Sequence, residues 1–453
     1  MFLRTVLHFW PALNRWLAAL PDTRFVPMVT YDRRFLCWWG LLLFCCKLGS
    51  RRQLDFQLRD PETYILDNVN RLSGCAQQSL PVHKTLSHFL GHVGSAALAW
   101  VRTECVRHLI RNKVLDAARF RGRFVIAIDG TGYLRFHQPH CAHCLVHKHG
   151  STVSYLHPVL EAKLVDPRGL ALSIGTEFIE NPLPHRSRAT LSDYEAVKQD
   201  CELKACARLA QSLKADFPQT PFCLSGDSLF ACGPTLTLCE QNHWSYVLTF
   251  KAGRTPSLWQ DFQGLLSLSP ENRLQCRRSD GTRQCFRWVN DLRYDDDAGR
   301  RHTVHALLCQ ERKDKEPSPQ TFAWLTDVRL SAANVRTVAE QAGRVRSKIE
   351  NQGFNLQKNS GLNLEHAYST QADILKAFYY LLQIAHLFLQ MFEMGSLLQH
   401  LAQEYSRSPR QLFGSLKNLA QRLLEGFRYA LLPEEAFDPV QAARGQIRLC
   451  DSS

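Results

Sequence analysis

The sequence has no uninterrupted apolar run long enough to cross a membrane. Its most apolar short segment, residues 37–46, is about half as long as the ~20 residues that a membrane helix needs. A longer apolar segment, residues 374–398, is interrupted by Lys376 and Glu393 and therefore predicts a buried helix. The N-terminus also lacks the pattern of a secretory signal peptide. We therefore expect a cytoplasmic protein with no membrane partner.

Internal repeats are absent, and the composition is not that of a disordered chain. Hydrophobic residues make up 45% of the sequence and charged residues 21%, which predicts a globular protein. A chain of 453 residues is long enough for roughly two to four domains with ample core.

The cysteines do not follow the pattern of a disulfide framework. There are 16, and most lie in apolar or helical contexts, such as Cys45, Cys46, Cys201 and Cys206. Because structural disulfides belong to oxidising compartments, this pattern favours a reduced, cytosolic one.

Acidic residues are too few to balance the basic ones. The chain has 55 Lys and Arg against 42 Asp and Glu, a net charge of +13 and a pI of about 9.1, which favours a polyanionic partner. Residues 1–120 contain 16 basic and 8 acidic residues, a net of 16 − 8 = +8, with apolar residues at helical spacing in 36–48, 83–89 and 96–118. We expect this region to be a basic helical domain that binds DNA. The alternative is a helical cap on a catalytic core with an ordinary basic surface.

From residue 121 the pattern changes to alternating strands and helices. Strands are predicted at 124–128, 153–165, 170–178, 222–226 and 244–251, and helices at 194–215 and 228–241. The order β-ββ-α-β-α-β is that of a ribonuclease H-like core, a mixed sheet whose first and fourth strands carry carboxylates. The predicted fold is therefore α/β, with this core flanked by helical N- and C-terminal domains.

A β-rich insertion divides the core. The first part of the core spans 121–252 and the insertion 253–320, with strand-like segments at 285–289 and 303–310. The core returns at 321–365 with a strand at 322–330 and a helix that begins near Ser331. Residues 366–453 are expected to form a helical C-terminal region that includes a helix at 409–424.

Three carboxylates occupy positions from which they can converge. Asp129 follows the run 124–128, and Asp227 follows the run 222–226. Glu350 lies on the helix after the insertion, four residues beyond Arg346 and beside an apolar stripe that would hold the helix against the sheet. The stripe consists of Val335, Val338, Ala342, Val345 and Ile349. Such carboxylates suit divalent metals that act on phosphodiesters.

The helix with Glu350 resembles the C-terminal signature of bacterial insertion-sequence DDE transposases. Residues 343–351, Gly-Arg-Val-Arg-Ser-Lys-Ile-Glu-Asn, match the Tyr-x2-Arg-x3-Glu-x6-Lys group at its arginine and glutamate. The resemblance covers about residues 121–365, including the position of the insertion. The chain departs from the signature at its tyrosine, where it has Gly343, and at its lysine, where it has Gln357 with Lys358 one residue later.

The resemblance implies a set of roles. Asp129, Asp227 and Glu350 would bind two Mg²⁺ or Mn²⁺ ions, Arg346 would neutralise a phosphate near the cut, and Lys358 would contact the DNA end. The enzyme would cleave DNA at transposon ends and join the resulting 3′-OH to target DNA. Its partner would be double-stranded DNA, and it would act in the bacterial nucleoid as a homodimer or a higher synaptic assembly.

Two further residues have candidate roles in DNA binding. Lys251, at the end of the fifth strand, is a candidate phosphate contact. Trp288, in the insertion, would stack on a flipped base by the same resemblance, or it is a core aromatic of the insertion.

Two other functions remain open. The chain could be a non-catalytic DNA-binding derivative of a transposase, although the complete carboxylate triad argues against it. It could also be a ribonuclease H-like nuclease that cuts DNA without strand transfer. Other polar residues could support the site or simply be solvated: Glu177, Glu180 and Asn181 after the third strand, and Asp200 and Glu202 on the next helix.

A cluster of histidines and cysteines follows the first strand. Cys141-x2-Cys144 is half of a zinc knuckle, which His147 or His149 could complete as a structural Zn²⁺ site. A redox Cys-x-x-Cys is one alternative, and a His-rich loop that contacts DNA without metal is another. The cluster consists of His137, His140, Cys141, His143, Cys144, His147 and His149.

Overall fold

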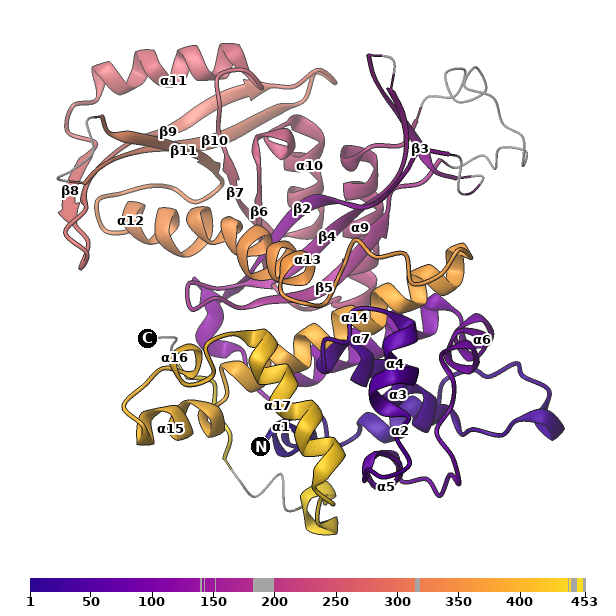
Figure 1. Ribbon diagram of the computed structural model, residues 1–453. Coiled ribbons are helices and arrows are strands. Elements are labelled where there is room, and N and C mark those ends of the chain that lie inside the picture. The colour runs from indigo at the N-terminus through magenta and orange to yellow at the C-terminus, as the bar shows by residue number, and fades with distance from the viewer. Residues whose placement is uncertain are drawn as a thin grey trace.

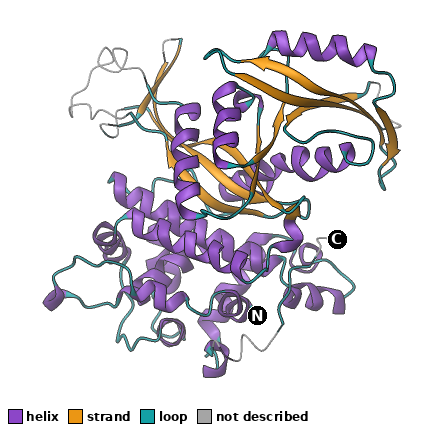
Figure 2. Cartoon of the chain, turned by 180° about the vertical axis from the view of Figure 1, so that it is seen from behind, coloured by secondary structure: helices purple, strands orange, loops and turns teal. Residues whose placement is uncertain are grey.

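The computed structural model describes residues 1–138, 141, 143–150, 152–181, 199–313, 318–438, 440 and 446–450. These residues form one mixed sheet of parallel and antiparallel strands, and most of the helices gather on one side of it (Figure 1). Figure 2 shows the same arrangement from behind, with the helical part below the sheet. The predicted α/β class with a mixed sheet is therefore confirmed.

The first 118 residues are helical, as their apolar spacing predicts. The predicted helices at 36–48 and 83–89 appear as α3 and α6. The helix predicted at 96–118 ends earlier, because Lys113 has a φ of 58° that a right-handed helix does not allow. The helices of this part are α1 (Phe2–Phe9), α2 (Leu13–Ala18), η1 (Val26–Met28), α3 (Arg33–Cys45), α4 (Arg51–Leu58), α5 (Ile65–Ser73), α6 (His83–Val93), α7 (Ser95–Arg111) and η2 (Asp116–Ala118).

All five strands that the sequence predicts for the core are present. β2 (Arg123–Phe136) pairs antiparallel with β4 (Thr152–Val165) on one side and parallel with β6 (Phe222–Gly226) on the other. β4 also pairs with β5 (Ala171–Phe178), and β6 pairs with β7 (Ser245–Thr249). The first and fourth predicted strands are therefore neighbours in the sheet.

β2 is longer than the sequence predicts. Asp129 was expected at the end of a strand, but β2 continues to Phe136 and pairs Asp129 with Glu161 of β4. That expectation is wrong, because the long antiparallel partner β4 supplies hydrogen bonds to the rest of β2. The pairing with β6 stops at Ile128, so Asp129 still stands where one neighbouring strand ends. Two short strands, β1 (Arg119–Phe120) and β3 (Leu145–His149), pair with β2 and β4.

The helices of the core are shorter than predicted. Of the helix predicted at 194–215, residues 194–198 lie outside the described residues, and α9 spans Glu202–Asp216. The segment predicted at 228–241 is divided into η3 (Ser228–Phe230) and α10 (Gly233–Asn242). Both α9 and α10 follow a strand and return the chain to the next one.

The insertion extends the core sheet. Its last strand, β11, pairs antiparallel with β7. The sheet therefore extends beyond β7 in the order β11, β10, β9 and β8. The sequence predicts β9, β10 and β11 but not α11 or β8, and residues 314–317 of the insertion lie outside the described residues. The elements are α11 (Pro256–Leu268), β8 (Arg273–Arg277), β9 (Arg283–Asp295), β10 (Arg301–Arg312) and β11 (Gln320–Thr326).

The helical segment after β11 is irregular. Its predicted stripe is buried along its whole length. Two π-helical turns interrupt it, a distortion that is frequent at functional sites. Its parts are α12 (Val335–Val338), the π turn η4 (Ala339–Gly343), the 3₁₀ turn η5 (Arg344–Arg346), the π turn η6 (Ile349–Phe354) and α13 (Asn355–Asn359).

The C-terminal helices pack together with the N-terminal ones. α14 contacts α1, α3, α6 and α7, and both α7 and α14 contact β5. The expected N- and C-terminal parts therefore form one helical body. A positive φ of 75° at Gly414 breaks the helix predicted at 409–424. The C-terminal elements are α14 (Ala372–Glu393), α15 (Ser396–Glu404), α16 (Pro409–Phe413), α17 (Leu416–Tyr429) and η7 (Glu434–Phe437).

One helix in the described part of the chain is long and apolar enough to cross a membrane. This is α14, and 89% of its most apolar window is buried inside the protein. Its apolar surface is thus covered by the surrounding helices and β5, as the sequence predicts for a core helix.

Candidate active site

Two carboxylates follow the last paired residues of β2 and β6. Ile128 pairs with Gly226 in the parallel register, and Asp129 and Asp227 are the next residues of the two strands. The register therefore places the two aspartates on adjacent strands at the same level. Asp227 also caps η3, since one of its carboxylate oxygens accepts a hydrogen bond from the N–H of Leu229 at 2.9 Å.

Arg346 connects the first aspartate with the third predicted carboxylate. Its Nη1 donates to Oδ2 of Asp129 at 3.4 Å, and its Nη2 lies 2.6 Å from Oε1 of Glu350. η5 and η6 both contact β2, so the buried stripe holds this pair against the sheet. The structure thus brings Asp129, Arg346 and Glu350 together, as the spacing on the helix predicts.

The carboxyl group of Asp129 resists ionisation. Burial is the main cause that raises its pKa to about 7, and Arg346 opposes this rise. The negative charges of Glu350, Asp227 and Glu202 raise the pKa of Asp129 further. Several acidic groups around one arginine give the site an excess of negative charge. A strongly perturbed carboxyl of this kind is typical of functional sites.

Glu202 is a fourth carboxylate at this site. It is the first residue of α9, and burial followed by the charge of Asp227 raises its pKa. It lies so close to β2 that a Cβ atom on Gly130 would be 2.1 Å from its Oε1. Because neighbouring residues of a strand face opposite sides, Glu202 approaches β2 from the side opposite to Glu350. The sequence analysis names Glu202 among residues that could support the site, and Gly130 leaves room for its carboxylate.

The carboxylates provide the kind of donors that Mg²⁺ and Mn²⁺ prefer. Oxygen ligands suit these hard cations, and the surplus negative charge would favour a cation. Across the described ranges, no three His, Cys, Asp or Glu side chains are grouped closely enough to hold a metal as they stand. Arg346 instead supplies a positive charge between Asp129 and Glu350. The donor type fits a divalent ion, and a bound ion would offset the repulsion that raises the pKa of Asp129.

A basic cleft of about 710 Å³ opens beside Arg346. One of its walls is the end of β7, where Lys251 is exposed. Clefts lined by charges of one sign concentrate ligands of the opposite sign, so this cleft suits a polyanion. Its charged lining consists of Lys251, Arg278, Arg344, Arg346 and Lys348, with Glu340 as the one carboxylate.

Gly343 stands at the tyrosine position of the signature, and its space is filled by Trp324. A Cβ atom on Gly343 would lie 2.7 Å from the indole ring. Trp324 is 4% exposed and stacks on Phe322, with ring centroids 6.1 Å apart and planes at 12°. The guanidinium of Arg344 lies 4.1 Å from the centre of the Phe322 ring. An aromatic side chain from β11 therefore fills the space that a residue at position 343 would need.

The lysine position of the signature holds an interior residue. Gln357 is fully buried, and its Nε2 lies 2.8 Å from Oε1 of Gln383 and 3.0 Å from Nδ1 of His386. Gln357 therefore connects α13 with α14 and has no access to DNA. Lys358 forms an ion pair with Glu365 at 2.7 Å, and its predicted contact with a DNA end stays a prediction.

Trp288 lies in the core of the insertion. Its side chain on β9 is 4% exposed. A buried indole has no face open to a nucleic-acid base, so the structure favours the alternative that Trp288 is a core aromatic.

The two predicted zinc-binding cysteines lie together. A hydrogen bond with the Cys144 thiol is the largest cause that raises the pKa of Cys141, and burial is the second. The sulfur of Cys141 also lies 3.6 Å from Nε2 of His157, a residue of β4 outside the predicted cluster of histidines and cysteines.

The predicted histidine ligands do not share the face of Cys144. His147 and His149 are exposed on β3 and pair with Ser154 and Thr152. Side chains alternate along a strand, so both project from the face opposite to Cys144. His140 of the same cluster lies outside the described residues.

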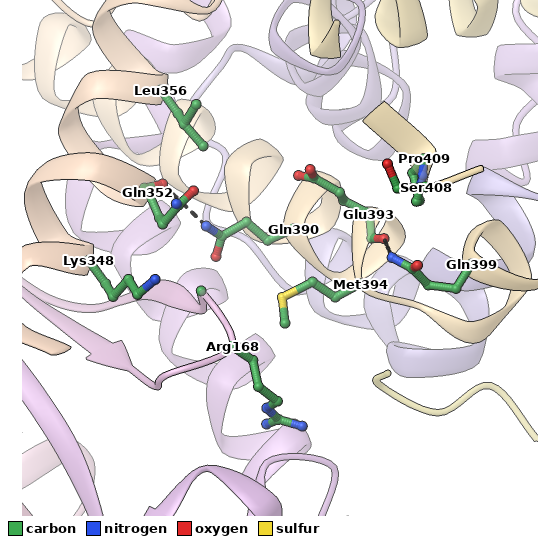
Figure 3. A pocket seen from close by; sticks show the side chains of 11 residues that line it. Arg168, Lys348, Gln352, Leu356, Gln390, Glu393, Met394, Gln399, Ser408 and Pro409 are labelled. Carbon is green, nitrogen blue, oxygen red and sulfur yellow. Dashed lines mark hydrogen bonds between the residues drawn. The ribbon is translucent and has the colours of Figure 1, made fainter. Parts of the chain in front are cut away.

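A second cavity, of about 270 Å³, lies between the Glu350 helix and α14 (Figure 3). Figure 3 shows Gln390 pointing toward Gln352, where its Nε2 donates to the backbone oxygen at 3.3 Å. Lys348 lines both this cavity and the basic cleft. The turn that carries Arg346 and Glu350 is thus anchored to the helical body.

Comparison of the chain with models of known protein families found no match, and comparison with curated proteins found none either.

Proposed function

We propose that this protein is a metal-dependent DNA transposase of the DDE type, with a ribonuclease H-like core. The observations that carry the proposal are the contacts of Arg346 with Asp129 and Glu350, beside a basic cleft, and the position of Asp227 directly after the strand that pairs with β2. Three residues far apart in the sequence come from two adjacent strands and one packed helix.

The topology of the sheet supports the proposal of a ribonuclease H-like core. Apart from the short strand β3 and the turn η3, the order of elements is β2, β4, β5, α9, β6, α10 and β7, the one expected for a ribonuclease H-like core. Its first and fourth strands, β2 and β6, are adjacent and carry the two aspartates. The insertion precedes the helix with Glu350, as in the transposase group that the signature resembles.

The proposed chemistry is phosphoryl transfer by positioned carboxylates. Asp129, Asp227 and Glu350 would hold two Mg²⁺ or Mn²⁺ ions, which would stabilise charge on the attacking and leaving oxygens of a phosphodiester. Water attacks the phosphorus and the bond to the 3′ oxygen breaks, which leaves a 3′-OH and a 5′-phosphate. This 3′-OH then attacks a phosphorus of the target DNA, so that a new phosphodiester forms, the P–O3′ bond of the target breaks and a target 3′-OH is released.

The basic residues position the DNA. Arg346 lies next to two of the carboxylates, so it can neutralise the phosphate that is cut. Lys251 and Lys348 line the cleft that starts at Arg346 and would contact neighbouring phosphates. The partner is double-stranded DNA, and the family mechanism calls for a homodimer or a higher assembly on paired ends.

Cleavage and strand transfer of a plasmid test the proposal. The plasmid carries the gene with its flanking DNA, and it is incubated with Mg²⁺ and either the wild-type protein or the Asp227→Asn variant. Asp297→Asn, at an exposed position of the insertion, is the matched control. We expect cut and joined products from the wild type and the control, and none from Asp227→Asn.

Three other outcomes contradict parts of the proposal. Equal cleavage by the wild type and Asp227→Asn would remove Asp227 from the mechanism. Cut ends that are never joined would indicate a nuclease. Binding of the DNA without any cleavage would indicate a non-catalytic DNA-binding protein.

A further inference from the structure

A second group of metal-binding side chains lies at the far end of β2. Figure 1 shows β3 and the strand ends next to it projecting away from the helical body. From Asp129 to Leu134, which pairs with His157, the strand covers about 16 Å, so this group is separate from the carboxylates. The outer half of β3 is exposed, and this tip therefore has little apolar core of its own.

The strand register brings a cysteine and a histidine face to face. β3 begins at Leu145, which pairs with Leu156 of β4, and extending this register by one residue would place Cys144 opposite His157. Opposite residues of antiparallel strands project from the same face with their Cβ atoms about 5 Å apart. Both side chains are buried: Cys144 is fully buried and His157 is 4% exposed.

Cys141 has the spacing of a zinc ligand relative to His157. Zn–S bonds of about 2.3 Å and Zn–N bonds of about 2.0 Å, at a tetrahedral angle, separate the two ligand atoms by about 3.5 Å. The observed distance between Sγ of Cys141 and Nε2 of His157 is 3.6 Å. The backbone N–H of His143 donates to the same sulfur at 3.3 Å, a contact that stabilises a thiolate.

Hydrogen bonds hold the backbone of His143, Cys144 and Val146. The side chain of Asn181 donates to the backbone oxygen of Cys144 at 3.1 Å, and its backbone N–H donates to that of His143 at 2.9 Å. The side chain of Gln199 bonds both backbone groups of Val146, at 2.7 and 2.9 Å. These contacts position the backbone next to Cys144.

We propose that Cys141, Cys144 and His157 bind a structural Zn²⁺ ion, with water as the fourth ligand. The Cys144 thiol now donates to the backbone oxygen of Cys141 at 3.2 Å, and rotation about its Cα–Cβ bond would turn its sulfur toward the ion. Both thiols lose their protons to the solvent when the ion binds, and His157 binds through neutral Nε2. This site replaces the predicted ligands His147 and His149 with His157, and it does not depend on the proposed transposase activity.

Metal analysis of the purified full-length chain, expressed with zinc and without a His tag, tests this proposal. We expect about one zinc per chain in the wild type and less than about a tenth of that in Cys144→Ser and His157→Gln. The double variant His147→Ala, His149→Ala is the matched control and should keep its zinc. Circular dichroism checks that each variant is folded.

A measurement on the wild type alone avoids any dependence on the variants. Exchange of zinc for Co²⁺ should produce the strong near-ultraviolet absorption of thiolate–cobalt bonds. Less than about half an equivalent of zinc in the wild type would overturn the proposal. So would wild-type zinc content in folded Cys144→Ser, or a cobalt spectrum without the thiolate band.

Discussion

Replacement of Asp129 by asparagine should stabilise the folded protein above neutral pH. Asp129 has a pKa of about 7 in the folded protein, compared with an ordinary value of 3.8. Below pH 3.8 the carboxyl is protonated in both states and does not affect stability. Between the two pKa values the unfolded chain ionises and the folded one does not, so stability falls as pH rises and levels off above pH 7.

The structure gives the size of this effect. Each pH unit between the two pKa values costs about 1.4 kcal/mol. From about pH 5 to about pH 8 the free energy of unfolding of the wild type should therefore fall by about 3 kcal/mol. That of Asp129→Asn should not fall in this way, because the amide does not ionise. This loss of stability results from the burial of a carboxylate among like charges, as expected for a site whose acidic groups serve a function.

Urea unfolding of the wild type and Asp129→Asn, at both pH values and without divalent metal, measures this difference. Asp297→Asn is the control, because Asp297 is exposed. At each pH this variant should have the same free energy of unfolding as the wild type. An advantage of Asp129→Asn that is the same at both pH values, or that shrinks toward pH 8, would refute the reasoning.

Three further predictions follow from close contacts and charges. Gly130→Ala should lower the free energy of unfolding by about 1–3 kcal/mol, because the new Cβ would meet the carboxylate of Glu202 on α9. A Cβ on Gly132 would meet no atom within 4 Å, so Gly132→Ala should lower the free energy of unfolding by less. Urea unfolding of both variants tests this prediction. Gln357→Lys, which places a lysine where the signature has one, should destabilise the protein by about 3–5 kcal/mol because it buries an unpaired charge. Lys358→Gln removes only a partly exposed ion pair and should lower the free energy of unfolding by less than about 1 kcal/mol. A stable Gln357→Lys would show that this position is not interior. Lys251→Ala should reduce the slope of log affinity for DNA against log salt by about 1, and an unchanged slope would mean that this lysine contacts no phosphate.

The main parts of the site could be predicted because they depend on local patterns. The apolar runs before Asp129 and Asp227 predicted two strands, and the order of elements made them neighbours. The stripe beside Arg346 and Glu350 predicted a helix packed on the sheet, and its residues are buried. These patterns can be recognised without knowing which distant residues are in contact.

The features that the sequence did not predict depend on long-range pairing. The carboxylate of Glu202 lies against Gly130 of β2, and the sulfur of Cys141 lies 3.6 Å from Nε2 of His157 on β4. The continuation of β2 beyond Asp129 depends on the length of its partner β4. Trp324, which fills the space beside Gly343, comes from β11. None of these contacts has a spacing along the chain that identifies it.

Binding of Mn²⁺, followed by electron paramagnetic resonance, tests the proposed metal site most directly. The wild-type protein and the variants Asp129→Asn, Asp227→Asn and Glu350→Gln are titrated with Mn²⁺, and the bound ions are counted. We predict about two ions per chain in the wild type and the loss of at least one in every variant, because the three carboxylates would share the ions. Equal Mn²⁺ binding by the wild type and all three variants would contradict the proposal that these carboxylates form a metal site.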